Sequence, residues 1–419
     1  MKKTIVTISI YLLSFYAIAQ ENITVNKGLL ATTNGSIVST HFDFVNQNNG
    51  SVINDGTIYF YGDYTNEGLF SYTTNSTTGY VVFEGKNKDT QLLNGNSPSF
   101  FYDALFNRNA NRAFNIHSDI ESAGTVNLFN GVLFVEKDLG GSFTFLKGAQ
   151  HINTSNKSHI DGEVIKIGDE PFKYPIGDKG FYRFASISAP IEATSKFTGE
   201  YVFENSDELY PHNSRTEVIK TINDKEYWII NRLANKDESV ILTLSWDQNT
   251  TPLELINNAT ENLHIVRWDA DQQLWVDEGG VVDFSNNSVS TPINVEGFGV
   301  FTLATVKEAL LNPGDVVIYN GVTPDGNGKN DYFIIDNIHY FPNNHVSIYN
   351  RWGRKVYETN AYDTKGNVFK GYAEGTNVVG KGEKLPTGTY YYVVEYLYDR
   401  GGANQWVKKV GYLHLENNN

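Results

Sequence analysis

The chain has 419 residues, with 33 Lys and Arg against 48 Asp and Glu, for a formal net charge of -15. This excess of negative charge repels phosphates and excludes nucleic acid as a partner, while the lack of cysteine excludes disulfides, thiolate metal sites and cysteine nucleophiles. Aromatic residues make up 14% of the chain and there are 37 glycines, which favours strands joined by tight turns, so we expect an all-β protein.

The first predicted element is a secretory signal peptide over residues 1–19. Lys2 and Lys3 precede an apolar run that is short for a membrane span and closes on Ala17-Ile18-Ala19, a small-x-small cleavage pattern. No later segment approaches the ~20 apolar residues that a transmembrane helix needs. We therefore expect a mature protein that starts at Gln20, lies outside the cytoplasm and does not span a membrane.

Residues 20–150 are predicted to form a repetitive β region. From residue 50 the sequence divides into GSVIND, GTIYFY, GDYTNE and GLFSYT, and the same place in each unit holds Val52, Ile58, Tyr64 or Phe70. A repeat that returns an apolar side chain to an equivalent position stacks the rungs of a β-solenoid around a continuous core. The alternative is an antiparallel meander, because Asn-Gly and Asp-Gly pairs are strong hairpin signals.

Residues 151–306 are predicted to form a β-sandwich. The longer segments GEYVFEN, EYWIINRL, SVILTLSWD, LHIVRWD, QLWVDEGG and GVFTLATV are bounded by Asn, Asp, Gly or Pro, as in antiparallel sheets. Trp268 and Trp275 flank a turn and are expected to face each other across a hairpin as sheet packing. Residues 307–311, KEALL, are interpreted as a linker to a further domain over residues 312–419.

The sequence contains no recognisable catalytic constellation. It lacks the nucleophile elbow, the H-E-x-x-H pair, the P-loop and the dinucleotide turn, and its nine histidines are scattered. We therefore expect no enzyme, no catalytic residue and no bound cofactor. One alternative is a glycan-binding or glycan-cleaving site that uses Trp268 and Trp275 together with the neighbouring acids Asp269, Asp271, Asp277 and Glu278.

A loop rich in Asp, Asn and Gly opens the C-terminal region, where residues 320–335 read NGVTPDGNGKNDYFII. Counted from Asp325, an EF-hand loop needs an oxygen ligand at the fifth position and Gly at the sixth, but the chain has Lys329 and Asn330 there. We interpret the loop as a turn held by its own side-chain hydrogen bonds, with Gly at positive φ. A looser calcium site through Asp325, Asn327 and Asp331 is the alternative.

Three blocks follow in order over residues 312–419: TPDGNGKNDYF, VSIYNRWGRKVYE and LPTGTYYYVVEY. Together they resemble the gliding motility-associated C-terminal domain, the type B sorting domain of the Bacteroidota type IX secretion system. Phe369-Lys370-Gly371 departs from that family, which commonly has Trp-x-Gly near this place. The residues that carry the resemblance are Thr323, Pro324, Asp325, Gly326, Asn327, Gly328, Asn330, Asp331, Phe333, Asn350, Arg351, Trp352, Gly353, Pro386, Gly388, Thr389, Tyr390 and Tyr391.

The resemblance implies an immunoglobulin-like sandwich of seven strands that the outer-membrane secretion machinery recognises. Independently, residues 350–353 predict a hairpin turn with Gly353 left-handed, and residues 385–388 predict a turn before a strand. The region is charge-balanced, with 11 basic and 11 acidic residues. The rest of the chain is then cargo, delivered to the cell surface or the medium.

For the cargo we expect a non-enzymatic, adhesin-like or structural surface protein, which is the interpretation favoured by its β-rich sequence. Its partner would be a surface polysaccharide or another cell-surface protein. A further alternative is an accessory component of the gliding or secretion apparatus itself.

Overall fold

The structure is a computed structural model that describes residues 23–417 except 86–89, 111, 217, 236–237, 258–261, 296, 307–315, 328, 365 and 400–403. The regular secondary structure of the described residues consists almost entirely of strands, as expected for an all-β protein. Within the described residues, helical turns are confined to α1 (Leu253–Ile256), η1 (Lys137–Leu139) and η2 (Ile338–Tyr340). No helix among the described residues is long and apolar enough to cross a membrane. The expected signal peptide and the linker 307–311 lie outside the described residues.

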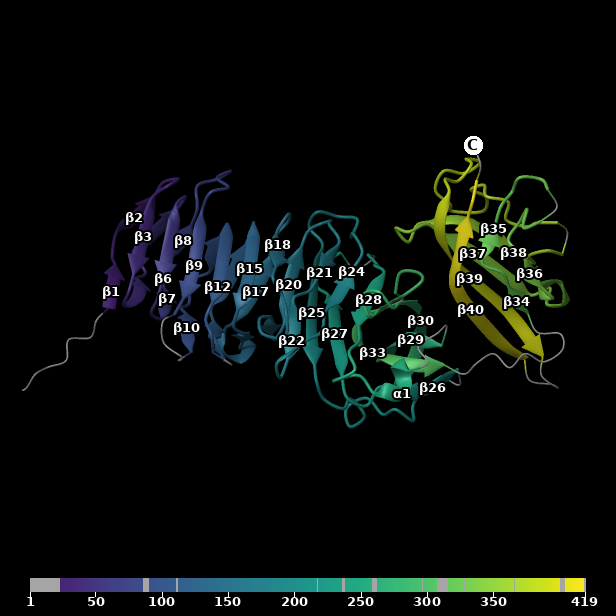
Figure 1. Ribbon diagram of the computed structural model, residues 1–419, viewed down its shortest axis with the longest axis horizontal. Helices are drawn as coiled ribbons and strands as arrows, with labels where there is room; N and C mark the ends of the chain where they lie inside the picture. Colours follow the sequence, from purple (N-terminus) through teal and green to yellow (C-terminus); the bar gives the residue numbers. More distant parts are fainter. Residues whose placement is uncertain are drawn as a thin grey trace, which may run out of the picture.

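The N-terminal part of the chain is a β-solenoid, visible in Figure 1 as a row of stacked short strands. Each rung has three strands, and each strand pairs in parallel with its equivalent in the next rung. The first sheet contains β1 (Ile23–Asn26), β4 (Asp43–Asn46), β7 (Tyr64–Asn66), β10 (Gln91–Asn94), β13 (Phe114–His117), β16 (Leu133–Val135), β19 (Ile160–Asp161) and β22 (Ile176–Asp178), with β23 (Phe181–Tyr182) antiparallel at its end.

The other two sides of the solenoid are built in the same way. The second contains β2 (Leu29–Thr32), β5 (Ser51–Asn54), β8 (Leu69–Ser71), β11 (Ser99–Phe101), β14 (Asp119–Ser122), β17 (Ser142–Phe145) and β20 (Val164–Ile167). The third contains β3 (Ile37–Thr40), β6 (Thr57–Phe60), β9 (Tyr80–Glu84), β12 (Asp103–Asn107), β15 (Thr125–Asn130) and β18 (Gln150–Ile152). The solenoid prediction is confirmed, and the meander alternative is wrong because the pairing is parallel.

The six-residue period corresponds to one side of a rung. Val52, Ile58 and Tyr64 point inward from three successive sides, and all are fully buried. After three sides the chain returns to the first position, so Phe70 on β8 lies beside Val52 on β5. The period fades beyond residue 79 because the loops between later strands differ in length, while the parallel register continues through β22.

A column of asparagines, half-buried at Asn26 and fully buried at Asn46 and Asn66, joins successive rungs at one corner of the solenoid. Asn26 Nδ2 donates to Asn46 Oδ1 at 2.9 Å, and Asn46 Nδ2 donates to Asn66 Oδ1 at 2.8 Å. Gly50 packs against this column, since a Cβ there would lie 2.3 Å from Asn46 Oδ1. Because buried amides require hydrogen-bond partners, the column fixes the rungs in register.

The second side of the solenoid continues directly into the antiparallel region. β20 pairs with β25 (Lys196–Val202), which is followed across the sheet by β27 (Tyr227–Arg232), β33 (Gly299–Val306), β29 (Leu263–Asp269) and β30 (Leu274–Gly279), with β26 (Ile219–Ile222) also on β33. A second antiparallel sheet contains β21 (Phe172–Lys173), β24 (Ala185–Ile187), β28 (Leu242–Ser245), β32 (Ser288–Ser290) and β31 (Val281–Asp283). One hydrophobic core extends from Phe44 to Leu303. The repetitive region was expected to end at residue 150, but Gln150 lies on β18, which pairs in parallel with β15 of the solenoid. The solenoid therefore continues beyond that residue.

The C-terminal domain has a separate hydrophobic core, formed by residues between Val316 and Leu415. Its main sheet has the order β35 (Gly321–Val322), β40 (Asn404–Leu415), β39 (Gly388–Asp399), β37 (Asn344–Tyr349) and β38 (Lys355–Asn360). β34 (Val317–Ile318) and β36 (Ile335–Asp336) form a small separate sheet. The immunoglobulin-like arrangement stays a prediction, since β35 pairs in parallel with β40 and three strands, β34, β35 and β36, have only two residues each.

Candidate functional site

Trp268 and Trp275 face each other across the β29–β30 hairpin, as expected. They are directly paired in register, and their ring centroids are 5.7 Å apart at an interplanar angle of 70°. Trp275 is fully buried, Trp268 is 8% exposed, and Trp275 Nε1 donates to the Tyr210 carbonyl at 3.1 Å. The pair therefore packs the sheet and offers no open ring face, so the glycan alternative at these two residues is not supported.

The acids near this hairpin contact backbone N–H groups and the side chains of His264 and Arg267. Asp269 accepts the N–H groups of Asp271 and Gln272, and the bond from Gln272 contributes most to lowering the pKa of Asp269. Asp277 contacts His264 Nδ1 at 2.8 Å, and Glu278 accepts from Arg267 Nε at 2.7 Å. Across the part of the chain that the structure describes, no group of three or more His, Asp or Glu is placed to hold a metal ion.

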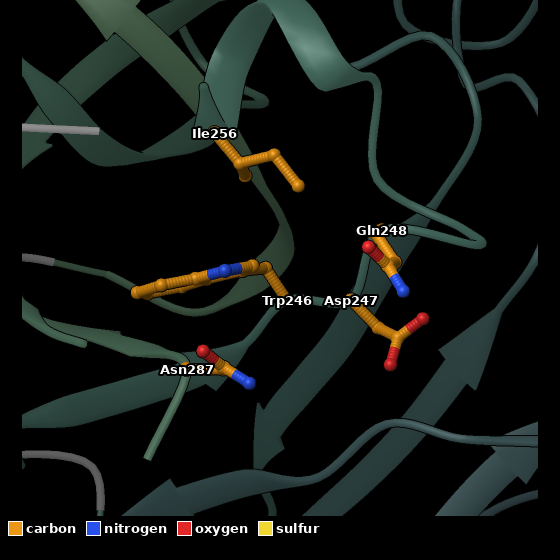
Figure 2. A pocket seen from close by; sticks show the side chains of 5 residues that line it. All are labelled: Trp246, Asp247, Gln248, Ile256 and Asn287. Atoms are coloured by element: carbon orange, nitrogen blue, oxygen red, sulfur yellow. The ribbon is translucent and has the colours of Figure 1, made fainter. Parts of the chain in front are cut away.

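A pocket of about 320 Å³ lies beside the second antiparallel sheet. Trp246 and Asp247 directly follow β28, and the Trp246 N–H donates to the carbonyl of Asn287 at 2.8 Å. Figure 2 shows the Trp246 indole edge-on between Ile256 and Asn287, with Asp247 and Gln248 to one side. The pocket thus combines an aromatic ring, an aliphatic wall and three oxygen-bearing side chains.

Buried charges anchor the polar wall of this pocket. Arg183 is 4% exposed, its Nη2 lies 3.1 Å from Asp247 Oδ1, and its Nε donates to the Thr250 hydroxyl at 2.6 Å. Glu226 is fully buried and accepts from the Tyr201 hydroxyl at 2.7 Å. Burial raises the pKa of Tyr201, which therefore keeps its proton as the donor. Buried charges are costly unless they are paired, so this network marks the pocket as a candidate site.

This pocket is not apparent from the amino-acid sequence. The available signal was Trp246-Asp247-Gln248 at the end of a predicted strand, where an aromatic ring meets two polar side chains. The other walls come from residues 256 and 287, whose proximity depends on the fold.

The Asp- and Asn-rich loop of the C-terminal domain is a turn closed by its own side chains. Asp325 accepts the N–H and the Nδ2 of Asn327 at 3.0 and 2.8 Å, and Asp331 accepts the N–H of Gly326 at 2.7 Å. Gly326 has a φ of 77°, as expected, and Gly328 lies outside the described residues. The side chains of Asp325, Asn327 and Asp331 thus accept hydrogen bonds from the backbone of their own loop. Calcium binding stays an untested alternative.

The remaining residues of the first block connect this turn to the core. The Thr323 N–H donates to the Asn330 carbonyl at 2.6 Å, which closes the loop that Pro324 begins. Phe333 is fully buried, and its N–H donates to the carbonyl of Phe369. Phe369 is also fully buried, so it is the aromatic side chain that fills the place where the sequence departs from the expected Trp.

The second block forms the predicted hairpin between β37 and β38. Asn350 Oδ1 accepts the N–H groups of Trp352 and Arg354, both at 3.0 Å, and Gly353 has a φ of 72°. The Arg351 guanidinium lies 4.3 Å from the centroid of the Trp352 ring. Because Trp352 is 61% exposed, the turn presents a stacked cation and indole on the surface.

The third block starts β39. The Tyr390 hydroxyl donates to the Pro386 carbonyl at 2.8 Å, and Tyr391 pairs with neighbours on both sides of its strand. Gly388 and Thr389 begin the strand. At Gly388 the φ is not positive, and a Cβ there would meet nothing within 4 Å, so this turn has room for a larger side chain. Gly353, by contrast, has a positive φ, so its turn favours glycine.

Comparison with known protein families matches residues 316–415 to the CHU_C type IX secretion signal domain. Residues 316–415 form a type IX secretion signal domain. The resemblance given by the three sequence blocks is therefore confirmed. No curated protein and no solved structure matches the chain.

The type IX signal domain exposes two large indoles. Trp352 at the β37–β38 turn is 61% exposed and Trp406 on β40 is 62% exposed. Tryptophan and arginine are enriched where protein surfaces bind each other. The secretion machinery is the partner that the type IX signal domain implies.

Proposed function

We infer that the chain is exported cargo whose residues 23–306 act as a non-enzymatic binding or structural module at the cell surface or in the medium. The type IX signal domain implies export by the type IX system. Residues 1–19 would first take the chain across the inner membrane as a signal peptide. The adhesin-like role of the cargo is our proposal.

The observation that carries the cargo proposal is the continuous core from Phe44 to Leu303. It joins the solenoid and the antiparallel sheets into one extended body, which Figure 1 shows as a long stack of strands. Solenoids of this kind present long surfaces for binding rather than a closed reaction chamber. Three of the acids that had suggested glycan cleavage, Asp269, Asp277 and Glu278, contact backbone N–H groups, His264 and Arg267 respectively, which supports a non-enzymatic role.

Export is tested by fusing residues 312–419 behind residues 1–19 and a fluorescent reporter. The reporter should reach the surface or medium in a bacterium that has the type IX system and stay periplasmic in a strain that lacks it. Deleting residues 312–419 from the native chain should likewise trap the cargo. If the reporter leaves the cell equally well without residues 312–419, the export proposal is wrong.

A matched pair of substitutions makes the same test sensitive to the folded signal domain. Gly353→Val places a β-branched residue at a φ of 72°, which costs at least about 1–2 kcal/mol, and should reduce export. Gly388→Val adds side-chain atoms where a Cβ meets open space, and should leave export near the native level. Equal export by the two variants would contradict recognition through the folded hairpin.

A further inference from the structure

The geometry points to dimerisation of the chain through the first rung of its solenoid, residues 23–42, which binds the same rung of a second copy. This rung is formed by β1, β2 and β3, and each of them is the last strand of its sheet among the described residues. Figure 1 shows the three strands at one end of the molecule and the type IX signal domain at the other. The inference goes beyond the proposed function, because it does not depend on export.

The hydrophobic core of the solenoid is open at this end. Leu30 on β2 and Val38 on β3 pack against the core but are only partly buried. Their register partners in the second rung, Val52 and Ile58, are fully buried. A further layer of chain on the first rung would complete the burial of Leu30 and Val38. Because removing apolar surface from water is favourable, this end of the solenoid favours a partner that covers it.

The outward side of the first rung is also more apolar than that of the second. On each of the three sides, the residue that starts the strand is large and apolar in the first rung, and its register partner in the second rung is polar. The three pairs are Ile23 with Asp43, Leu29 with Ser51, and Ile37 with Thr57. Leu29 and Ile37 are 72% and 70% exposed, so the apolar surface continues around the rim of the open end.

The three edge strands lack the residues that usually prevent pairing with another chain. An edge strand presents unpaired N–H and C=O groups, and natural proteins protect such edges with charged side chains or proline. The strands read ITVN in β1, LLAT in β2 and IVST in β3, without a charge or a proline. The first rung therefore offers three edges that suit backbone hydrogen bonding to a partner.

Charge and size favour a second copy as that partner. Lys27 is the only residue of the first rung with a formal charge when His is neutral, although the whole chain has a net charge of -15. Two copies of this acidic chain can therefore meet at their first rungs, because these rungs contain no carboxylate. One rung also approaches the ~20–30 residues that each partner contributes to an interface of standard size.

The opposite end of the solenoid determines how two copies meet. There the second sheet continues from β20 into β25, so within the described residues no rung at that end has three free edges. The copies therefore meet first rung to first rung, in a two-fold contact that closes at two chains. A two-fold axis across the rung reverses the chain direction, so the facing strands are antiparallel. One strand then pairs with its own copy, and the other two pair with each other.

Analytical ultracentrifugation of the purified chain, residues 20–419, tests the inference. Between about 1 and 100 µM the average mass should rise from that of one chain towards that of two, as a dimer with a micromolar Kd requires. A chain that stays monomeric at the highest concentration would overturn the inference. A mass that grows beyond two chains would overturn it as well, because a two-fold contact closes at the dimer.

Two charged substitutions locate the contact on the first rung. Leu29→Lys combined with Ile37→Lys places two cations on the edge strands at exposed positions, where the native fold tolerates them, and circular dichroism checks that the fold is retained. The double variant should raise the Kd of the dimer at least about tenfold. Leu139→Lys is the matched control, since Leu139 is 58% exposed on η1, beyond β16 and far from the first rung, and should leave the Kd unchanged. Equal Kd values for the native chain and the double variant would overturn the assignment.

Electron microscopy of the native dimer checks the geometry without any substitution. The particles should be elongated, with the two type IX signal domains at opposite ends, because the first rung lies at the other end of each chain. Signal domains that lie side by side would overturn the contact between first rungs.

Export of the double variant separates this inference from the proposed function. The variant should reach the cell surface or medium as the native chain does, because it leaves the type IX signal domain unchanged. Normal export of a native chain that is monomeric refutes only the dimer. Export that does not depend on residues 312–419 refutes the proposed function, whatever the mass of the purified chain.

Discussion

Asn46 is a fully buried polar residue in a core otherwise built largely from aliphatic and aromatic side chains. Its Oδ1 accepts from Asn26, and its Nδ2 donates to Asn66 Oδ1 at 2.8 Å and to the Leu69 carbonyl at 3.0 Å. The side chain therefore bridges the rung before it and the rung after it. A single residue contributes both to the stability of the stack and to its register.

We predict that Asn46→Ala destabilises the solenoid by about 2 kcal/mol or more, because it leaves the buried Oδ1 of Asn66 without its donor. Asn94→Ala is the matched control, since Asn94 lies half-buried on the outward side of the same sheet and should change stability by less than about 0.5 kcal/mol. Urea unfolding followed by circular dichroism measures both. Equal effects would mean that the asparagine column is dispensable.

Individual residues differ in how far the sequence could place them. Asp325 and Asn327 bond to groups within a few residues, so local turn chemistry predicted their role. The Asn26–Asn46–Asn66 column does not follow from the six-residue period, although its members are evenly spaced in sequence. Their spacing corresponds to a whole rung of three sides, whereas one six-residue unit corresponds to a single side. The Trp246 pocket could not be predicted, since its walls meet only when β28, α1 and β32 assemble.

At the scale of elements, the six-residue units carried enough information to predict a solenoid. Each unit specifies one side of a rung, with one inward apolar residue and a turn. The sequence did not show how many units close a rung, because that depends on the parallel pairing of β5 with β8 and of β6 with β9. The sequence also did not show that β20 pairs with β25, because this antiparallel pairing likewise depends on the folded arrangement of the strands.

The last rungs of the solenoid hold a pair of nearby carboxylates, which predicts a pH dependence. Burial, together with the charge of Asp178, raises the pKa of Asp161 on β19 to about 7. Its unfolded pKa is about 3.9, so the folded chain binds the proton more tightly between these values. The contribution of Asp161 to stability is therefore fully retained below about pH 4 and falls as the pH rises towards 7.

Asp161→Asn should remove this loss of stability at high pH, because the amide carries no charge. The variant should be more stable than the native chain at about pH 8, and the difference in melting temperature should shrink as the pH falls towards about 4. Asp138→Asn, an exposed change in η1, is the control and should show no such trend. A stability difference for Asp161→Asn that is the same at both pH values would contradict the prediction.

At the scale of the whole molecule, the chain contains two bodies with separate cores. One extends through the solenoid and the antiparallel sheets, and the other belongs to the type IX signal domain. A smaller cluster around Trp268 and Trp275 packs on the other face of the antiparallel sheet. The type IX signal domain therefore has a hydrophobic core that does not depend on the residues of the cargo core.

We predict two calorimetric transitions that respond to different core substitutions. Phe101 is 1% exposed and packs against Phe70 and Phe83 with ring centroids 5.3 and 5.7 Å apart, so Phe101→Ala should cost about 3–5 kcal/mol in the cargo transition alone. Ile348→Ala, in the fully buried centre of the signal domain, should cost about 2–5 kcal/mol in the other transition. Because neither side chain belongs to the other core, each substitution should leave the second transition in place. A single transition that both substitutions shift would mean that cargo and signal domain unfold together, and that export could not be separated from the folding of the cargo.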